Sequence, residues 1–194
     1  GHLVLDIPVS HHLPPATHVE VTTQLTGNRL VLPKQDLVAD GLQGQVRFST
    51  REGLIAESLQ GRLLGAPVQA RISSTVRGDT LQLVQVDLDG LVTATSLRNW
   101  LGGPLWDAFK GESRYQARIR IPSGPQPGQL LVTSGLAGMS ILLPTPLAKG
   151  VEPLALRYQS SLGGTQQLAR LQLGKQLNAG LVWREEGLHA ALLR

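Results

Sequence analysis

The sequence predicts an all-β protein, built on an antiparallel sheet with one short broken helix, and three observations lead to this prediction. Apolar and polar residues alternate along many short segments, as they do in a strand with one buried and one solvated face. Glycine-containing turns such as Gly27-Asn28 and Glu52-Gly53 separate most of these segments. The composition is 41% hydrophobic but only 4% aromatic, so the chain is apolar enough to fold, with a mainly aliphatic apolar surface.

Four segments show the alternation most clearly, and each places its apolar side chains on one face. The apolar sets are Val68, Ala70, Ile72 and Val76 in 66–77; Tyr115, Ala117, Ile119 and Ile121 in 114–121; Leu154, Leu156 and Tyr158 in 154–159; and Leu181 and Trp183 in 177–184. Further strands are expected at 3–9, 18–25, 28–32, 42–50, 54–64, 80–89, 129–134, 138–143 and 167–173. Within 80–89 the alternation changes phase after Leu83, which predicts a β-bulge.

Residues 96–109 depart from the period of two, because their apolar residues have helical spacing. Ser96 is the expected N-cap, and Gly102-Gly103-Pro104 should end one helical turn and begin another. The segment contains Trp100, Leu101, Trp106 and Phe109. These side chains are candidates either for a plug that covers one end of the sheet or for a lateral gate that contacts the membrane.

The chain is expected to be a single segment, 1–194, of a larger protein. Its best internal boundary, 122–128, is either a long loop within one sheet or a hinge between two halves. Gly1 and His2 resemble the remnant of an expression tag, and a strand-like pattern begins at Leu3. Any membrane anchor would then lie outside the chain.

The charge pattern does not indicate nucleic-acid binding. The net charge is +4, but the basic residues are scattered rather than clustered with aromatic residues. Arg114, Arg118 and Arg120 form the densest group, and their strand spacing indicates either one solvated strand face or a surface attracted to anionic headgroups. The absence of cysteine excludes disulfides and thiolate metal sites.

No motif for catalysis or for cofactor binding stands out. Phosphate-binding loops and nucleophile elbows are absent from the sequence. His11, His12 and His18 cluster near Glu20, but a proline-flanked loop explains them as well as a metal site does. The stretch 87–90 resembles the start of a calcium loop without its later glutamate, so a hairpin turn is expected there. We therefore expect no enzyme activity, no cofactor and no metal.

Several stretches together resemble the YhdP family of AsmA/TamB-like proteins. The strongest, 131–150, is similar to a family pattern in which an S-x-L-x-G turn precedes an LP-x-PL-x-K segment. The matching residues are Ser134, Leu136, Gly138, Leu143, Pro144, Pro146, Leu147 and Lys149. The stretches 42–72 and 90–121 resemble two further family units, so that the resemblance covers about residues 20–185. Gly135 stands where the family has an acidic residue, and Tyr115 replaces a tryptophan.

The resemblance implies a strongly curved, taco-like β-groove, as in bridge-like lipid-transfer proteins of the Gram-negative envelope. It implies a periplasmic segment of an inner-membrane-anchored protein that moves phospholipids between the inner and outer membranes, without catalytic residues or a cofactor. Acyl chains would be the partners, and any protein partners in the envelope are unspecified.

The residues themselves are compatible with such a groove, because an aliphatic sheet face has to be covered by something. The sheet can close on itself as a sandwich or barrel, or stay open and be covered by lipid tails. The apolar sets of the four alternating segments are the candidate groove lining. One alternative is a structural or assembly β-domain that binds another envelope protein and has a closed, dry core. An enzyme such as a glycan hydrolase is the other.

Overall fold

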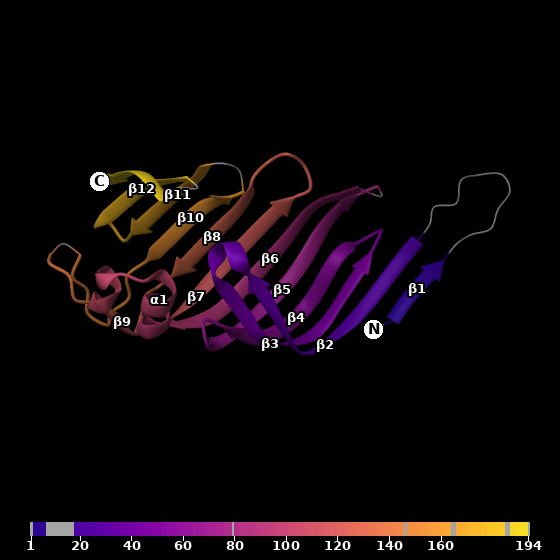
Figure 1. Ribbon diagram of the computed structural model, residues 1–194, viewed down its shortest axis with the longest axis horizontal. Coiled ribbons are helices and arrows are strands. Elements are labelled where there is room, and N and C mark those ends of the chain that lie inside the picture. Colours follow the sequence, from indigo (N-terminus) through magenta and orange to yellow (C-terminus); the bar gives the residue numbers. More distant parts are fainter. Residues whose placement is uncertain are drawn as a thin grey trace.

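The computed structural model describes residues 2–6, 18–78, 80–145, 147–163, 166–184 and 187–193. In these ranges the chain forms one antiparallel sheet in which nearly every strand pairs with its neighbours in sequence (Figure 1). The order is β1-β2-β3-β4-β5-β6-β7-β8-β10-β11-β12-β13, and β9 pairs with β7 outside this path. The sheet stays open, so the prediction of an all-β, antiparallel fold with a curved sheet is confirmed.

The strands of the sheet match most of the predicted segments. Their bounds are β1 (His2–Asp6), β2 (His18–Leu32), β3 (Leu37–Ser49), β4 (Gly53–Leu63), β5 (Ala66–Arg77), β6 (Thr80–Thr93), β7 (Phe109–Pro122), β8 (Gly128–Ser134), β9 (Met139–Ile141), β10 (Leu156–Leu162), β11 (Gln166–Leu173), β12 (Leu177–Arg184) and β13 (Gly187–Leu193). The helical elements are η1 (Pro33–Gln35), α1 (Ala94–Leu101) and η2 (Pro104–Ala108).

Three local predictions can be compared with this sheet. The β-bulge is confirmed: Thr75 pairs with Leu83 and Val76 with Leu81, which leaves Gln82 as the extra residue of β6. The hairpin turn expected at 87–90 is wrong, because these residues lie inside β6 and pair with β7. The 123–127 segment, inside the candidate boundary, joins β7 to β8, which pair directly beside it.

The helical insert begins earlier than predicted. Thr93 is the N-cap of α1, and Ser96 is its N3 residue. The two residues form a reciprocal capping box, in which the Ser96 amide donates to Thr93 Oγ1 at 3.1 Å and the Thr93 amide donates to Ser96 Oγ at 3.3 Å. The prediction of Ser96 as N-cap was therefore wrong, because three hydroxyl-bearing residues, Thr93, Thr95 and Ser96, stand close together here and only the structure shows which one precedes the helix. The break at Gly102 and Gly103 before η2 is as predicted.

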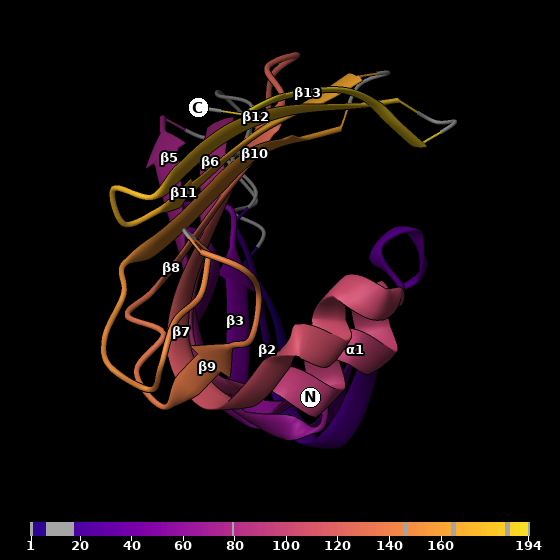
Figure 2. The ribbon, with the colours of Figure 1, turned by 90° about the vertical axis from the view of Figure 1, so that its left-hand side faces the viewer.

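The sheet curves strongly, and α1 lies on its concave side (Figure 2). The main buried cluster lies at the same end of the molecule, where Leu136, Met139 and Ile141 pack against Leu173 of the sheet. Elsewhere the concave side carries no second layer of described strands. A sheet that is packed on one side only at its end leaves much of its concave face open to solvent.

Candidate binding groove

Strand register places an uninterrupted apolar row on one face of the sheet. Residues that pair directly across neighbouring strands point to the same face. One such row crosses ten strands, from β2 to β12: Leu25, Gly44, Leu59, Ala70, Leu88, Ala117, Val132, Tyr158, Leu171 and Ala179. The next row contains Ile72, Val86, Ile119, Leu130, Ser160, Ala169 and Leu181. We call this the apolar face.

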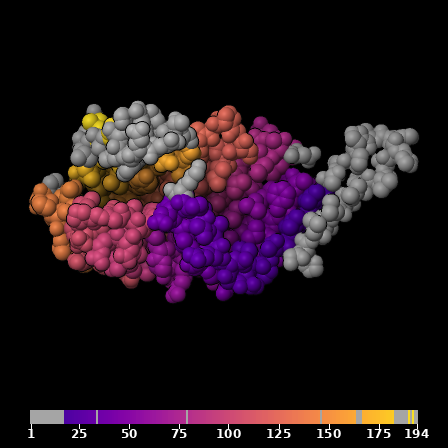
Figure 3. Space-filling model, viewed as in Figure 1, coloured from indigo at the N-terminus to yellow at the C-terminus, as the bar shows by residue number. Residues whose placement is uncertain are grey.

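The apolar face is the concave one. Val92, Leu156 and Leu177 share it by register, and all three pack against the buried cluster at the end where α1 lies. Figure 2 shows α1 on the inside of the curve. The space-filling view shows α1 and the β2–β3 hairpin next to each other in front of the sheet (Figure 3).

Charged residues are confined to the other, polar face. Among the directly paired residues whose side chains the structure describes, every Asp, Glu, Lys and Arg lies there. One row, for example, runs from Arg71 through Asp87 and Arg118 to Arg170, with Leu131 and Gln159 between them. The trough is therefore uncharged along its paired lining, a composition suited to hydrocarbon.

The candidate lining residues lie together on this face, apart from Leu154 and Trp183. Val68 and Ala117 are buried at 7% exposure, whereas Ile121 is 50% exposed. Leu154 precedes β10 and packs, like Leu156, against the buried cluster rather than lying in the open part of the trough. The backbone of Trp183 pairs with Gln167, but its side chain lies outside the described part of the chain. Contact of this set with acyl chains stays a prediction.

The few hydroxyl groups of the apolar face are largely bonded within the protein. Ser74 Oγ donates to the Leu54 carbonyl at 2.8 Å and accepts from the Leu54 amide at 3.0 Å. Ser134 Oγ donates to the Arg114 carbonyl at 2.6 Å, and Ser160 Oγ donates to the Ser161 carbonyl at 2.9 Å. These bonds leave those serines with little capacity to hold a polar ligand.

Tyr115 lies flat against β6 because its cross-strand partner is glycine. A Cβ atom added to Gly90 would come within 2.8 Å of the phenol oxygen of Tyr115. Burial of the phenol, with a further contribution from the nearby Asp89 charge, raises the pKa of Tyr115 above its ordinary value. The ring therefore adds apolar area to the lining and stays neutral at physiological pH.

The four plug or gate candidates have different surroundings. Phe109 packs against the buried cluster, and the Trp106 ring lies 5.0 Å from the Phe109 ring, centroid to centroid. The Trp100 indole Nε1 donates to the Gln35 carbonyl at 2.8 Å, and Leu101 is 44% exposed. Phe109 and Trp106 thus anchor the insert, while Trp100 and Leu101 face outward from the cluster. The plug and gate roles stay predictions.

Lys149 of the LP-x-PL-x-K segment has a structural setting that the sequence did not reveal. Its side chain is 6% exposed, and its ammonium donates to the carbonyls of Leu136, Met139 and Gly150 at 2.8, 2.5 and 2.8 Å. Burial lowers the pKa of Lys149, and the charge of Glu152 opposes this shift. The residue therefore ties the β8–β9 connection to the segment that precedes β10.

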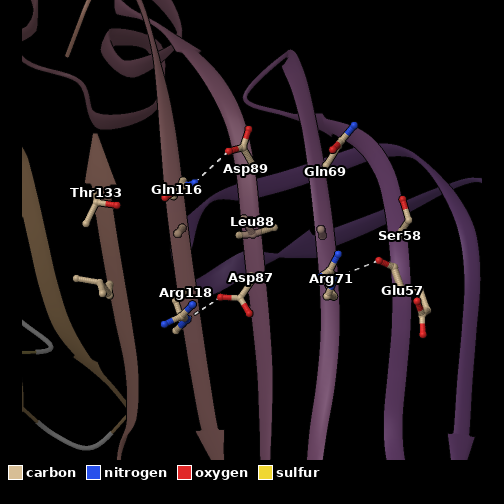
Figure 4. A pocket seen from close by; sticks show the side chains of 13 residues that line it. Glu57, Ser58, Gln69, Arg71, Asp87, Leu88, Asp89, Gln116, Arg118 and Thr133 are labelled. Atoms are coloured by element: carbon tan, nitrogen blue, oxygen red, sulfur yellow. Dashed lines mark hydrogen bonds and ion pairs between the residues drawn. The ribbon is translucent and has the colours of Figure 1, made fainter. Parts of the chain in front are cut away.

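A shallow hollow of 640 Å³ lies on the polar face, across β4 to β8 (Figure 4). Ion pairs and hydrogen bonds link neighbouring strands along it: Arg118 Nε lies 2.6 Å from Asp87 Oδ1, and Gln116 Nε2 donates to Asp89 at 3.4 Å. The sequence carried a signal for this ladder, because Asp87 and Asp89 alternate in one strand as the arginines do in the next. The charges lining the hollow are of both signs, which gives it no preference for an ionic ligand.

Acid should weaken this ladder. Burial alone would raise the pKa of Asp87, but hydrogen bonds from Arg118 and Gln85 and the charges of Arg118 and Arg71 outweigh it, and the pKa is lowered. Asp87 therefore stabilises the fold above pH 3.8, and this contribution is lost as pH falls through the lower folded pKa. We expect Asp87→Asn to cost less than about 1 kcal/mol at pH 7, because the carboxylate is partly exposed. Urea denaturation between pH 7 and pH 2 should show this difference in the free energy of unfolding becoming smaller as the pH falls. If the stability difference between the original protein and Asp87→Asn were the same at pH 2 as at pH 7, the ionised Asp87 carboxylate would not be its cause.

The histidine cluster is only partly within the described residues. His11 and His12 lie outside them, while His18 Nδ1 lies 3.1 Å from Thr50 Oγ1 and His18 Nε2 lies 3.9 Å from Glu20 Oε2. Within the described ranges, no three His, Cys, Asp or Glu side chains are grouped for metal binding. No helix in those ranges is both long and apolar enough to cross a membrane.

An open antiparallel trough, apolar inside and charged outside, defines a class of groove-forming β proteins. The model of the YhdP protein family matches residues 1–194. The chain therefore belongs to the YhdP family, and the resemblance noted in the sequence is confirmed. Membership in this family fits a protein of the cell envelope. No curated protein and no solved structure matches the chain.

Proposed function

We propose that this chain is a periplasmic segment of an inner-membrane-anchored envelope protein, and that it moves phospholipids between the inner and outer membranes along its concave apolar face. The observation that carries the proposal is the confinement of charge to the convex face, while apolar residues continue across ten strands of the concave one. The acyl chains would lie in the trough, with the headgroup at its open side. No catalytic step and no cofactor are part of the proposal.

The energetic case rests on solvent-exposed aliphatic surface. Each methylene that leaves water for an apolar surface gains roughly 0.8 kcal/mol. Ile121 is 50% exposed and Phe48 is 39% exposed, and both lie on the apolar face by register. A long aliphatic lining, with few unsatisfied polar atoms, binds a tail without fixing its position along the trough. Such binding suits a cargo that has to slide.

The proposal is tested by asking what the protein carries. The chain should be purified without detergent from Gram-negative cells and examined by native mass spectrometry, followed by organic extraction of the same sample. We expect a bound population whose mass excess equals that of phospholipid and is removed by extraction. A lipid-free protein that instead binds one envelope protein stoichiometrically would favour the assembly-domain alternative.

A further inference from the structure

The distal part of the β2–β3 hairpin, residues 28–41, begins at a pair of glycines that forms a hinge, and beyond it, among the described residues, only Ala39 and Asp40 pair with β4, at Leu63 and Arg62. Gly27 and Gly41 lie at the same level of the two strands, since Thr26 pairs with Gln43 and Asn28 with Leu42. Both glycines have positive φ, 95° and 62°, and an added Cβ would meet nothing within 4 Å. Their role is therefore conformational rather than one of packing. The register also shifts at this level on both strands, between Thr26 and Leu30 and between Asp40 and Gln43.

Beyond the hinge, the hairpin is braced as one unit, which we call the flap (28–41). Leu30 pairs with Ala39, and Leu32 pairs with Leu37. Arg29 Nε lies 3.2 Å from Asp40 Oδ1, directly beside the hinge. A motion at the two glycines would therefore carry the flap as a body instead of separating its strands, and it would part the two pairs that Ala39 and Asp40 make with β4.

The far end of the flap is fastened lightly. Among the described residues, the hydrogen bond from Trp100 Nε1 to the Gln35 carbonyl is the one that joins the flap to α1. It is exposed to solvent, and a single exposed hydrogen bond adds little to stability. Figures 2 and 3 show the flap and α1 side by side on the concave side of the sheet.

Apolar side chains lie exposed on both sides of this fastening. Leu30, Val31 and Leu32 of the flap are 49%, 52% and 38% exposed, and Leu101 of α1 is 44% exposed. Exposed aliphatic residues grouped at a movable boundary are surface that a hydrocarbon chain can cover. Leu30 and Leu32 are on the apolar face by register, so this surface continues into the trough.

We propose that the flap is a hinged side wall of the groove, latched to α1 by Trp100, and that it opens to admit phospholipid acyl chains from the side. This inference rests on the proposed function. It assigns lateral entry to one segment, whereas entry only along the length of the trough would need no moving part.

The chain contains no cysteine, so two introduced thiols can be cross-linked selectively. Gln35→Cys and Asn99→Cys place exposed thiols on the flap and on the helix residue next to Trp100. A reducible bismaleimide should lock the flap shut and slow uptake of a fluorescent phospholipid from phosphatidylethanolamine–phosphatidylglycerol vesicles at least tenfold, with recovery on reduction. Arg29→Cys with Asp40→Cys is the matched control, because it joins the two flap strands without tethering them to α1.

Spin labels on the same Gln35→Cys and Asn99→Cys pair give a readout independent of transport. We expect Trp100→Phe, which removes the N–H donor but keeps an aromatic ring, to add a longer-distance population and to speed lipid uptake. Equal lipid uptake by locked and reduced protein would overturn the proposal that the flap opens. A single short distance between the spin labels that Trp100→Phe leaves unchanged would also overturn it. If the unlocked protein takes up no lipid at all, the proposed function fails, and the spin-label distances still decide whether the flap moves.

Discussion

Replacing Ile119 by aspartate should abolish lipid binding while leaving the protein folded. Ile119 lies in the middle of the apolar face, between Val86 and Leu130. Its side chain is half-buried in the open trough, so water can still reach a carboxylate there in the lipid-free protein. An acyl chain laid across the same position would have to bury that charge, which costs far more than the burial of a few methylene groups contributes. We expect the bound phospholipid fraction to fall at least about tenfold, equivalent to about 1.4 kcal/mol.

The matched control for this prediction is Gln129→Asp. Gln129 lies on the neighbouring strand β8 but on the polar face, where it pairs with Arg120. Ile119→Asp and Gln129→Asp introduce the same charged residue, which is a poor strand former in both places. They differ only in the face of the sheet on which the aspartate lies. Gln129→Asp should retain lipid, as measured by native mass spectrometry, with circular dichroism showing both variants folded. Equal lipid loss in both variants, or lipid retention by folded Ile119→Asp, would contradict the proposal that acyl chains bind on the apolar face.

Replacing Lys149 by methionine should give the largest loss of stability among these substitutions, about 2–4 kcal/mol. Methionine fills a similar volume, but it cannot donate to the carbonyls of Leu136, Met139 and Gly150. Removing the buried ammonium does relieve its desolvation, the cause of its lowered pKa. The buried carbonyls that lose their charge-assisted bonds outweigh this relief, because breaking one side of a buried polar set leaves the other side unpaired.

The effect of Lys149→Met is best measured as the free energy of unfolding in urea, beside Lys110→Met. Lys110 is exposed on β7, opposite Ser140 of β9, so its replacement changes charge near the same region without removing a buried donor. The control should change stability by less than about 0.5 kcal/mol. A Lys149→Met protein as stable as the original would mean that the three carbonyls are satisfied by water.

The faces of the sheet could be predicted from the sequence because strand periodicity is local. The alternation of Val68, Ala70 and Ile72, and of Ala117 and Ile119, assigns each set to one face, and antiparallel pairing of neighbours in sequence then aligns the sets. The bulge at Gln82 was visible for the same reason. Leu154 could not be separated from the open lining, because its packing against the buried cluster depends on the fold of the β9 region.

The features that depend on distant segments were not predictable. The Trp100–Gln35 hydrogen bond joins residues 65 positions apart, and neither residue has a pattern that points to the other. The setting of Lys149 was not predictable, since nothing in its sequence neighbours indicates that three carbonyls converge on it. The stretch 87–90 was mistaken for a turn because Asp and Gly favour turns, whereas cross-strand arginines make those aspartates favourable inside a strand.

The nearest-neighbour order of the strands has a consequence for how such a protein can grow. No strand on the main path waits for a distant segment to be synthesised before it can pair, so folding can proceed hairpin by hairpin from either end. Each added hairpin widens the sheet by about 10 Å, at about 4.8 Å for each strand. Duplication of a hairpin would thus lengthen the trough without disturbing any existing pair, and the span of the protein becomes a simple multiple of its strand number.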